Sequence, residues 1–522
     1  MTDATPEQHQ VPPELLERLD EPASDRTRTR LATDLAADDA AQGHRRFGHP
    51  RGLYTLFGLE LWERFSFLGF QAILALYLAD AVASGGLGYT EGVASSVVAA
   101  YGALVYLVAI GGAWIADRVA GTYRSVLWGA IVIACGHIFM GIPAAFATWV
   151  GLSLIIVGTG LLKPNVATMV GELYPRGSDR RDAGFSIYYA GINVGAFLGP
   201  LIAGFLGQNI QWHAGFLAAA VGMILGLIQY VIGGKHLAGR VQDRIVRLNF
   251  RADAPFWTTI GVVAAAVGVG LLFSLLRPDP LGVLVNGITV VSAVVPIVFL
   301  VWMYRSHKVT ATERRNLIPF ALLLVALVAY NLTYFQTGNT LNFLALNHTD
   351  NTILGMHYPS TWYISLTAIV EIIMGPVLAW LWVRMGSRQP HVSFKVGLGA
   401  VFGGAAFLTI ALAAAVTPAG ALIAAGWIVI CYVLLGLGDL ILQTSGMSAT
   451  TKLAPHAFKS QTMAMWFAAM ALAQGIQAQV VKLYDDESIG AYFGVQGLLV
   501  VAYGVLLIAM SPWLARRMRT IV

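Results

Sequence analysis

Three charged residues stand close together in a long apolar stretch near the start of the chain. The segment reads Glu60-Leu-Trp-Glu63-Arg64. Spacings of three and four place these side chains on one face of a helix. Charges inside an apolar helix are costly and commonly serve a function. Two carboxylates beside one guanidinium predict a proton-coupling site, and the alternative is a buried ion pair that only locks helices together.

A lysine followed by a proline lies deep in another apolar stretch, which reads Gly160-Leu-Leu-Lys163-Pro164-Asn165. A lysine at that depth needs a partner. The carboxylates of Glu60 and Glu63 are candidates, and so is the carboxylate of a substrate. The alternative is that the side chain extends to the membrane interface.

Two further carboxylates, Glu371 and Asp439, lie in apolar stretches of the second half. Each is a candidate proton or ligand group, and each could instead be a protonated packing residue. No Ser/His/Asp set, metal-spaced histidine cluster or phosphate-binding loop accompanies the apolar stretches. We therefore predict no catalytic residues, no metal and no other cofactor, and we do not expect an enzyme.

The composition indicates which kind of structural elements position these residues. Of 522 residues, 57% are hydrophobic and only 12% are charged, whereas soluble domains carry roughly 25% charged residues. Lipid must therefore surround much of the chain, and we predict an all-α membrane protein with about fourteen spanning helices. The expected spans are 53–80, 92–116, 125–147, 149–173, 183–207, 213–234, 255–276, 281–303, 316–345, 360–385, 392–416, 420–448, 460–483 and 490–514.

The cations cluster in loops such as 235–251 and 304–315, which predicts that these loops and both termini are cytoplasmic. This pattern is typical of topology in a bacterial cytoplasmic (inner) membrane, and no basic patch for nucleic acid is present. The expected layout is a cytoplasmic tail, a six-helix bundle, a basic linker with two extra helices, and a second six-helix bundle. The expected boundaries are 1–50, 51–235, 236–315 and 316–522. Two such bundles suit alternating access around a central site.

Several segments resemble the proton-dependent oligopeptide transporter (POT, or PTR) family of the major facilitator superfamily. The first apolar stretch is similar to the family motif Glu-x-x-Glu-Arg-Phe-Ser-Tyr-Tyr-Gly, and 160–165 is similar to its fourth-span lysine segment. The segment 185–195 is similar to the signature Phe-Tyr-x-x-Ile-Asn-x-Gly. The resemblance runs from about residue 48 to the end of the chain.

The resemblance implies the major facilitator fold and the import of di- and tripeptides with protons, and we expect a monomer embedded in membrane lipid. The implied coupling network is Glu60, Glu63, Arg64 and Lys163, to which we add Glu371 and Asp439 as candidates. The expected peptide-binding residues are Arg64, Tyr106, Lys163, Asn193, Trp466 and Asp439. The chain also departs from the family pattern. Phe67 and Leu68 stand at two motif tyrosines, Gln71 at an arginine, and Phe335 at a glutamate.

In the family, that arginine and that glutamate form a gate between the bundles, so both charges are lost together here. Glu371 is unusual for the family, and we expect that it takes over the role of the missing carboxylate. Two alternatives stay open. The chain could carry another small solute with protons, such as nitrate, a drug or a metabolite, or it could be a peptide receptor that does not transport.

Overall fold

Long helices make up most of the computed structural model, which describes residues 45–46, 48–174, 180–237, 276–418, 420–455 and 458–518. Twelve helices in this part of the chain are long and apolar enough to cross a membrane. Helix α3 (Arg51–Ala79) is of similar length and carries Glu60, Glu63 and Arg64. The strands are limited to pairs of two residues each. The predicted all-α membrane protein is confirmed.

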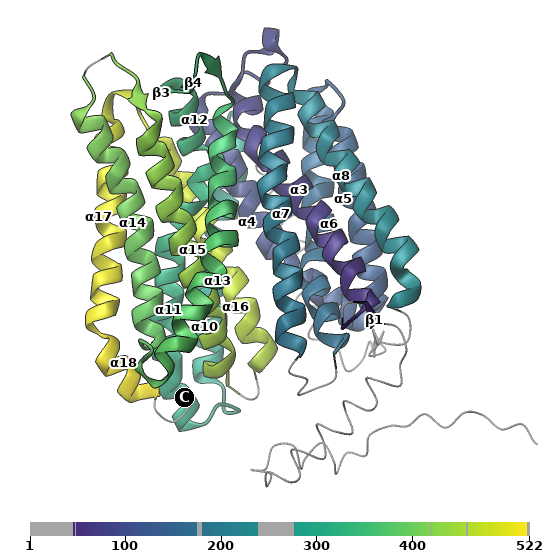
Figure 1. The fold of residues 1–522 in the computed structure, drawn as a ribbon, viewed down its shortest axis with the longest axis vertical. Coiled ribbons are helices and arrows are strands. Elements are labelled where there is room, and N and C mark those ends of the chain that lie inside the picture. Colours follow the sequence, from purple (N-terminus) through teal and green to yellow (C-terminus); the bar gives the residue numbers. More distant parts are fainter. Residues whose placement is uncertain are drawn as a thin grey trace, which may run out of the picture.

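The first bundle follows the expected order of six helices (Figure 1). These are α3, α4 (Glu91–Ile115), α5 (Thr122–Met140), α6 (Ala145–Glu172), α7 (Arg180–Asn209) and α8 (Trp212–Gly233). Glycines allow close contacts between neighbours. A Cβ added at Gly129 of α5 would lie 2.8 Å from the carbonyl oxygen of Gly158 on α6, and one added at Gly199 of α7 would lie 2.9 Å from the amide nitrogen of Gly69 on α3. The third span is shorter than expected, because the chain turns at residues 141–144.

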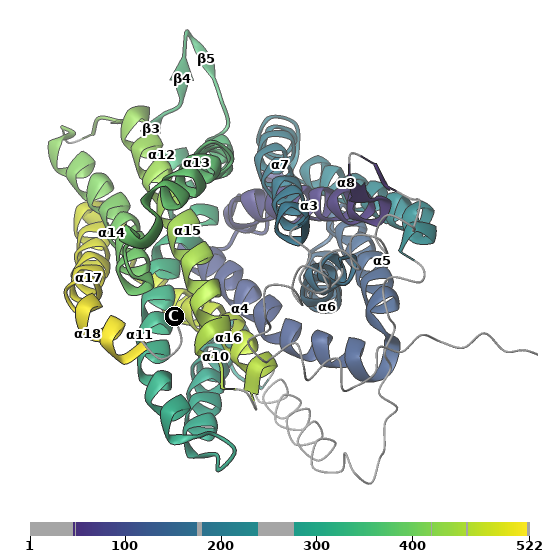
Figure 2. The ribbon, with the colours of Figure 1, turned by 60° about the horizontal axis from the view of Figure 1, so that its bottom comes forward.

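The second bundle lies beside the first (Figures 1 and 2). Its long helices are α11 (Ala311–Tyr334), α13 (Ile364–Met385), α14 (Val392–Val416), α15 (Ala425–Leu453), α16 (Lys459–Val480) and α17 (Ile489–Ala509). The short helix α18 (Ser511–Met518) follows α17. Helix α11 starts with a capping box, in which the Thr310 hydroxyl accepts from the Glu313 amide and the Glu313 carboxylate accepts from the Thr310 amide.

The expected single span 316–345 is wrong in detail, because α11 gives way to the 3₁₀ turn Phe335–Gly338 and the short helix α12 (Thr340–Asn347). Asn339 has φ −138° and ψ −96°, outside the helical region, and its side-chain oxygen accepts from the Thr340 amide at 2.6 Å. This side chain caps α12 and restarts the helix.

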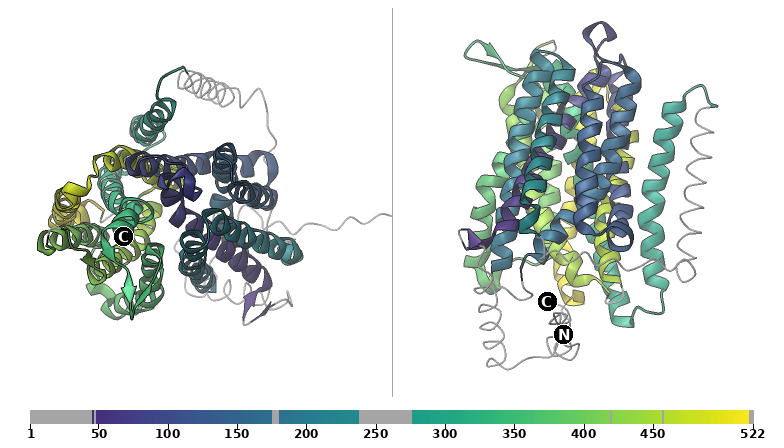
Figure 3. Two further views of the ribbon diagram at one scale, coloured as in Figure 1. Left: turned by 90° about the horizontal axis from the view of Figure 1, so that it is seen from above. Right: turned by 90° about the vertical axis from the view of Figure 1, so that its right-hand side faces the viewer.

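One of the two expected extra helices is present as α10 (Pro280–Arg305). The Thr289 hydroxyl of α10 donates to the Gly475 carbonyl of α16 at 2.9 Å. Val290, Val294 and Ile297 of α10 are exposed, as expected for a helix that faces lipid. Figure 3 shows α10 at the outside of the two bundles. The other extra helix, expected at 255–276, lies outside the described residues except for its last residue, as does nearly all of the expected tail 1–50. The layout with a two-helix linker therefore stays a prediction.

The two bundles are joined by hydrogen bonds at the end where α3 finishes and α12 lies, the top in Figure 1. The Asn342 amide donates to the Ala72 carbonyl at 2.7 Å, and the Ser365 hydroxyl donates to the Phe197 carbonyl at 2.8 Å. Gln208 at the end of α7 bonds the hydroxyls of Ser360 and Thr361, both at 3.1 Å. These contacts close the interface at this end.

Candidate functional site

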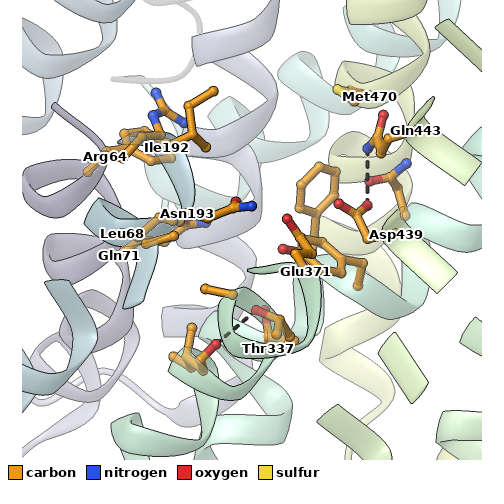
Figure 4. Close-up of a pocket in the computed structure, with 18 of the residues that line it drawn as sticks. Arg64, Leu68, Gln71, Ile192, Asn193, Thr337, Glu371, Asp439, Gln443 and Met470 are labelled. Atoms are coloured by element: carbon orange, nitrogen blue, oxygen red, sulfur yellow. Dashed lines mark hydrogen bonds between the residues drawn. The ribbon is translucent and has the colours of Figure 1, made fainter. Parts of the chain in front are cut away.

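A cavity of about 200 Å³ lies between the bundles (Figure 4), and Thr337 lines it on the side of the closed end. Helices α3, α4 and α7 form one wall, and α11, α13, α15 and α16 form the other. The residues of the first wall include Arg64, Phe67, Leu68, Gln71, Tyr106 and Asn193. The residues of the second wall include Asn331, Tyr334, Phe335, Thr367, Glu371, Asp439, Gln443 and Met470.

The Arg64 guanidinium is held by two carboxylates of its own helix. Its Nη2 donates to Glu63 Oε1 at 2.7 Å, and its Nε also contacts Glu63 Oε2. Glu60 Oε1 lies 3.4 Å from Arg64 Nε, one turn earlier on α3. Glu63 is only 1% exposed and Arg64 is 8% exposed. The predicted clustering on one helical face is therefore present.

Lys163 of α6 lies against aromatic rings. Its Nζ lies 4.6 Å from the centroid of Tyr106 on α4 and 5.5 Å from the centroid of Phe67 on α3. These are cation–π distances. None of the hydrogen bonds or salt bridges found among the described residues involves the Lys163 ammonium. The candidate pair of Lys163 with Glu60 or Glu63 is therefore not made in this conformation, in which both carboxylates pair with Arg64.

Two carboxylates lie on the wall opposite Arg64 and Asn193 (Figure 4). Asp439 of α15 accepts a hydrogen bond from Gln443 Nε2 at 3.2 Å, across one turn of the helix. Glu371 of α13 lines the same cavity. Both side chains are half-buried. The cavity thus presents a cation on one wall and two carboxylates on the other.

The remaining expected residues fall into two groups. Tyr106 and Asn193 line the cavity. Glu60, Glu63, Lys163 and Trp466 lie behind its lining. Trp466 of α16 is 1% exposed, and its ring is so close to α15 that a Cβ added at Gly446 would overlap it. The indole therefore packs within the second bundle and does not line the cavity in this conformation.

The departures from the family pattern gather at this cavity. Phe67, Leu68, Gln71 and Phe335 all line it. Phe335 packs against the Tyr106 ring of the other bundle, with centroids 5.9 Å apart. An aromatic contact thus joins the bundles at Phe335, the position of the family's gate glutamate.

Sequence reasoning missed Asn331 and Gln443, which both line the cavity. The Asn331 amide nitrogen donates to the Leu327 carbonyl at 2.8 Å, whereas its side-chain oxygen is buried with no hydrogen-bond partner. A search for neutral polar residues inside apolar stretches could have found both, because an amide in a spanning helix is also unusual. No group of three or more His, Cys, Asp or Glu that could hold a metal occurs in the described ranges.

Comparisons with known proteins agree with this architecture. A family model described as "POT family" matches residues 123–495. The chain is 40% identical over 479 residues to the "Uncharacterized transporter YclF" of Bacillus subtilis, covering 91% of this chain and 96% of the relative. It is 35% identical over 475 residues to a "Di-/tripeptide transporter" of Lactococcus lactis subsp. cremoris, covering 89% and 96%.

Solved structures are also similar. A crystal structure of peptide transporter POT in complex with sulfate matches with a TM-score of 0.86 and 41% identity, over 92% of this chain and 99% of the other. A POT family transporter in complex with 5-aminolevulinic acid matches with a TM-score of 0.85 and 33% identity, over 90% of this chain and 98% of the other.

Proposed function

Because the chain belongs to the POT family, it is a peptide transporter and not an enzyme, and we propose that it imports di- and tripeptides together with protons. The predicted family membership is confirmed by relatives that match along most of their length. Proton coupling, the bacterial cytoplasmic membrane, cytoplasmic termini and a monomer embedded in lipid are parts of the proposal. We also keep the predicted division into bundles 51–235 and 316–522, joined by 236–315.

The opposite charges on the two cavity walls carry this proposal. A short peptide is a zwitterion, so its pocket must offer a cation to the carboxylate at one end and an anion to the ammonium at the other. Arg64 on the first wall suits the peptide carboxylate through charge-assisted hydrogen bonds. Asp439 on the second wall suits the ammonium, and Asn193 can hydrogen-bond the peptide backbone.

Coupling follows from the pairing of Arg64. With Glu63 and Glu60 ionised, the guanidinium is engaged within its own helix. A proton on either carboxylate weakens that hold and frees Arg64 for the peptide carboxylate. Lys163, held only by aromatic faces, then supplies the second positive charge beside the remaining carboxylate. When the peptide leaves, the ion pair re-forms and the proton is released.

Alternating access follows from the closed end. The contacts of Asn342, Ser365 and Gln208 shut the side of the cavity near α12, so we assign this conformation to a state that opens toward the opposite, cytoplasmic end. Breaking these contacts and closing the other end would expose the same cavity to the outside.

Competition in reconstituted liposomes tests the substrate class. Labelled dialanine is taken up under an inward proton gradient, and unlabelled dialanine, N-acetyl-dialanine, dialanine amide and nitrate are added in excess. We expect strong competition only from dialanine, because the other three lack one or both charged termini of a peptide.

The two alternatives give different results. Competition by nitrate would favour a carrier of another solute. Saturable dialanine binding without uptake would favour a receptor.

A further inference from the structure

Glu371 is a carboxylate without a counter-charge. Among the described residues, none donates a hydrogen bond to it and none forms a salt bridge with it. Asp439, by contrast, accepts from Gln443. A carboxylate near the middle of a spanning helix is costly unless something neutralises it. The compensating group must therefore come from the contents of the cavity that Glu371 lines.

The groups that face Glu371 add to this need. Asp439 of α15 and Tyr334 of α11 line the same cavity, and the hydroxyl of Tyr330 on α11 donates to the Leu435 carbonyl at 2.6 Å. On α7, the cavity residues Ile192, Asn193 and Ala196 carry no charge. The nearest cation on the cavity wall is Arg64 of the opposite bundle, which already pairs with Glu63 and Glu60. The second wall is thus left with an excess of negative charge.

A neutral peptide cannot remove this excess. Its carboxylate pairs with Arg64 and its ammonium pairs with Asp439, so no group of the peptide neutralises Glu371. Two occupants can neutralise a second carboxylate beside a bound peptide, namely a proton and a cationic side chain of the peptide itself. Glu371 and Asp439 both project into the space between the walls (Figure 4), so a side chain extending from a peptide held by Asp439 can reach Glu371.

We propose that Glu371 is a specificity residue, which binds the cationic side chain of a lysine- or arginine-containing peptide and binds a proton when the peptide is neutral. This inference rests on the proposed function. Proton and side chain compete for one carboxylate, so the transporter prefers basic peptides most strongly where protons are scarce. As the pH falls, Glu371 becomes protonated and the preference declines.

Two dipeptides of matched shape test the proposal. Alanyl-lysine and alanyl-norleucine differ mainly in the terminal ammonium of the side chain. Their apparent affinities are measured as competitors of labelled dialanine uptake at neutral and at mildly acidic pH. In the wild type, we expect alanyl-lysine to compete better by about tenfold at neutral pH, the effect of a close charge pair, and by less in acid.

Three variants locate the effect. Glu371→Gln is expected to abolish the difference between the two peptides at both pH values; for this variant the two peptides compete for dialanine binding to the purified protein, so that a loss of proton-coupled uptake does not hide the result. Asp439→Asn is expected to weaken both peptides together and to keep their ratio, because it removes the partner of the shared amino terminus. Glu487→Gln, which removes an exposed carboxylate far from the cavity, controls for net charge and is expected to behave as the wild type.

Some results would overturn the inference. One is equal competition by both peptides in the wild type at both pH values. Another is a preference that survives in Glu371→Gln, or one that is lost in Asp439→Asn. If Glu371→Gln does not fold, two measurements still test the proposal. They are the ratio of the two peptide affinities in Asp439→Asn and the pH dependence of that ratio in the wild type. Failure of the proposed function has a separate signature, because dialanine itself would then not be taken up.

Discussion

Arg64 and Lys163 lie over the same aromatic ring. The guanidinium carbon of Arg64 is 5.0 Å from the centroid of Phe67, and the Lys163 Nζ is 5.5 Å from it. Only the arginine has carboxylate partners within salt-bridge distance in the described structure. The two cations are therefore neighbours, but carboxylates hold the guanidinium and aromatic rings hold the ammonium. A proton on Glu63 or Glu60 weakens the ion pairs of Arg64 and so changes which of the two cations is free to bind a peptide.

Removing the lysine should separate coupling from exchange. We expect Lys163→Ala to lower gradient-driven accumulation of dialanine by at least about tenfold, which corresponds to about 1.4 kcal/mol. Counterflow exchange should survive, because Arg64 and Asp439 still bind the peptide. Lys482→Ala is the matched control, since Lys482 is exposed and, within the described part of the chain, its Nζ donates only to Gln479, at 3.0 Å. Full accumulation by Lys163→Ala would contradict the coupling role.

The Tyr106 ring should matter more than its hydroxyl. The ring holds the Lys163 ammonium, whereas no hydrogen bond of the hydroxyl is found among the described residues. Tyr106→Phe should keep most gradient-driven uptake. Tyr106→Ala should lose about 0.5–2 kcal/mol of cation–π stabilisation, roughly 2- to 30-fold in uptake. The measurement is the initial uptake rate of each variant, normalised to protein amount. If Tyr106→Phe is as slow as Tyr106→Ala, the result would argue against the cation–π contact.

The two carboxylates of α3 should differ in their effect on stability. Glu63 makes two contacts with Arg64 and is 1% exposed, whereas Glu60 lies farther from the guanidinium. Glu63→Gln leaves a buried cation without its main partner, a change that commonly costs about 3–5 kcal/mol. We expect a clear loss of thermal stability in detergent for Glu63→Gln and a smaller one for Glu60→Gln. The reverse order would show that Glu60 is the main partner.

The closed end depends on a close approach between α7 and the turn before α13. A Cβ added at Gly204 would overlap the Thr361 hydroxyl. Gly204→Leu should therefore prevent closure, lower uptake more than about tenfold, and leave a folded protein whose cavity stays open at this end. A cysteine placed in the cavity should then react with a reagent added from the α12 side.

Gly375→Ala is the control for this prediction, because a Cβ there meets nothing within 4 Å. Normal uptake by Gly204→Leu would mean that closure at this end does not require the approach seen here.

Helix positions could be predicted well, because the polar residues that interrupt apolar runs also mark the turns. The break between α11 and α12 could not, since it depends on the Asn339 backbone and the side chain that caps α12. The shared face of Glu60, Glu63 and Arg64 follows from helical spacing alone.

Contacts between helices could not be predicted from the sequence. Whether Lys163 contacts carboxylates or aromatic rings depends on how α3, α4 and α6 pack. The spacing of residues within one helix does not determine this. The same holds for Trp466, whose helix is rotated so that the indole faces α15. Glu371 and Asp439 could be recognised as unusual, but not as members of one cavity, because they lie on separate helices.

Accumulation of dialanine with simultaneous proton entry tests the central claim most directly. Purified protein in liposomes is given an acidic exterior, and labelled dialanine and internal pH are followed together. The account predicts that dialanine rises above its external concentration while the interior acidifies, and that both signals vanish when the proton gradient is collapsed. Dialanine that only equilibrates, or that accumulates without any proton movement, would contradict it.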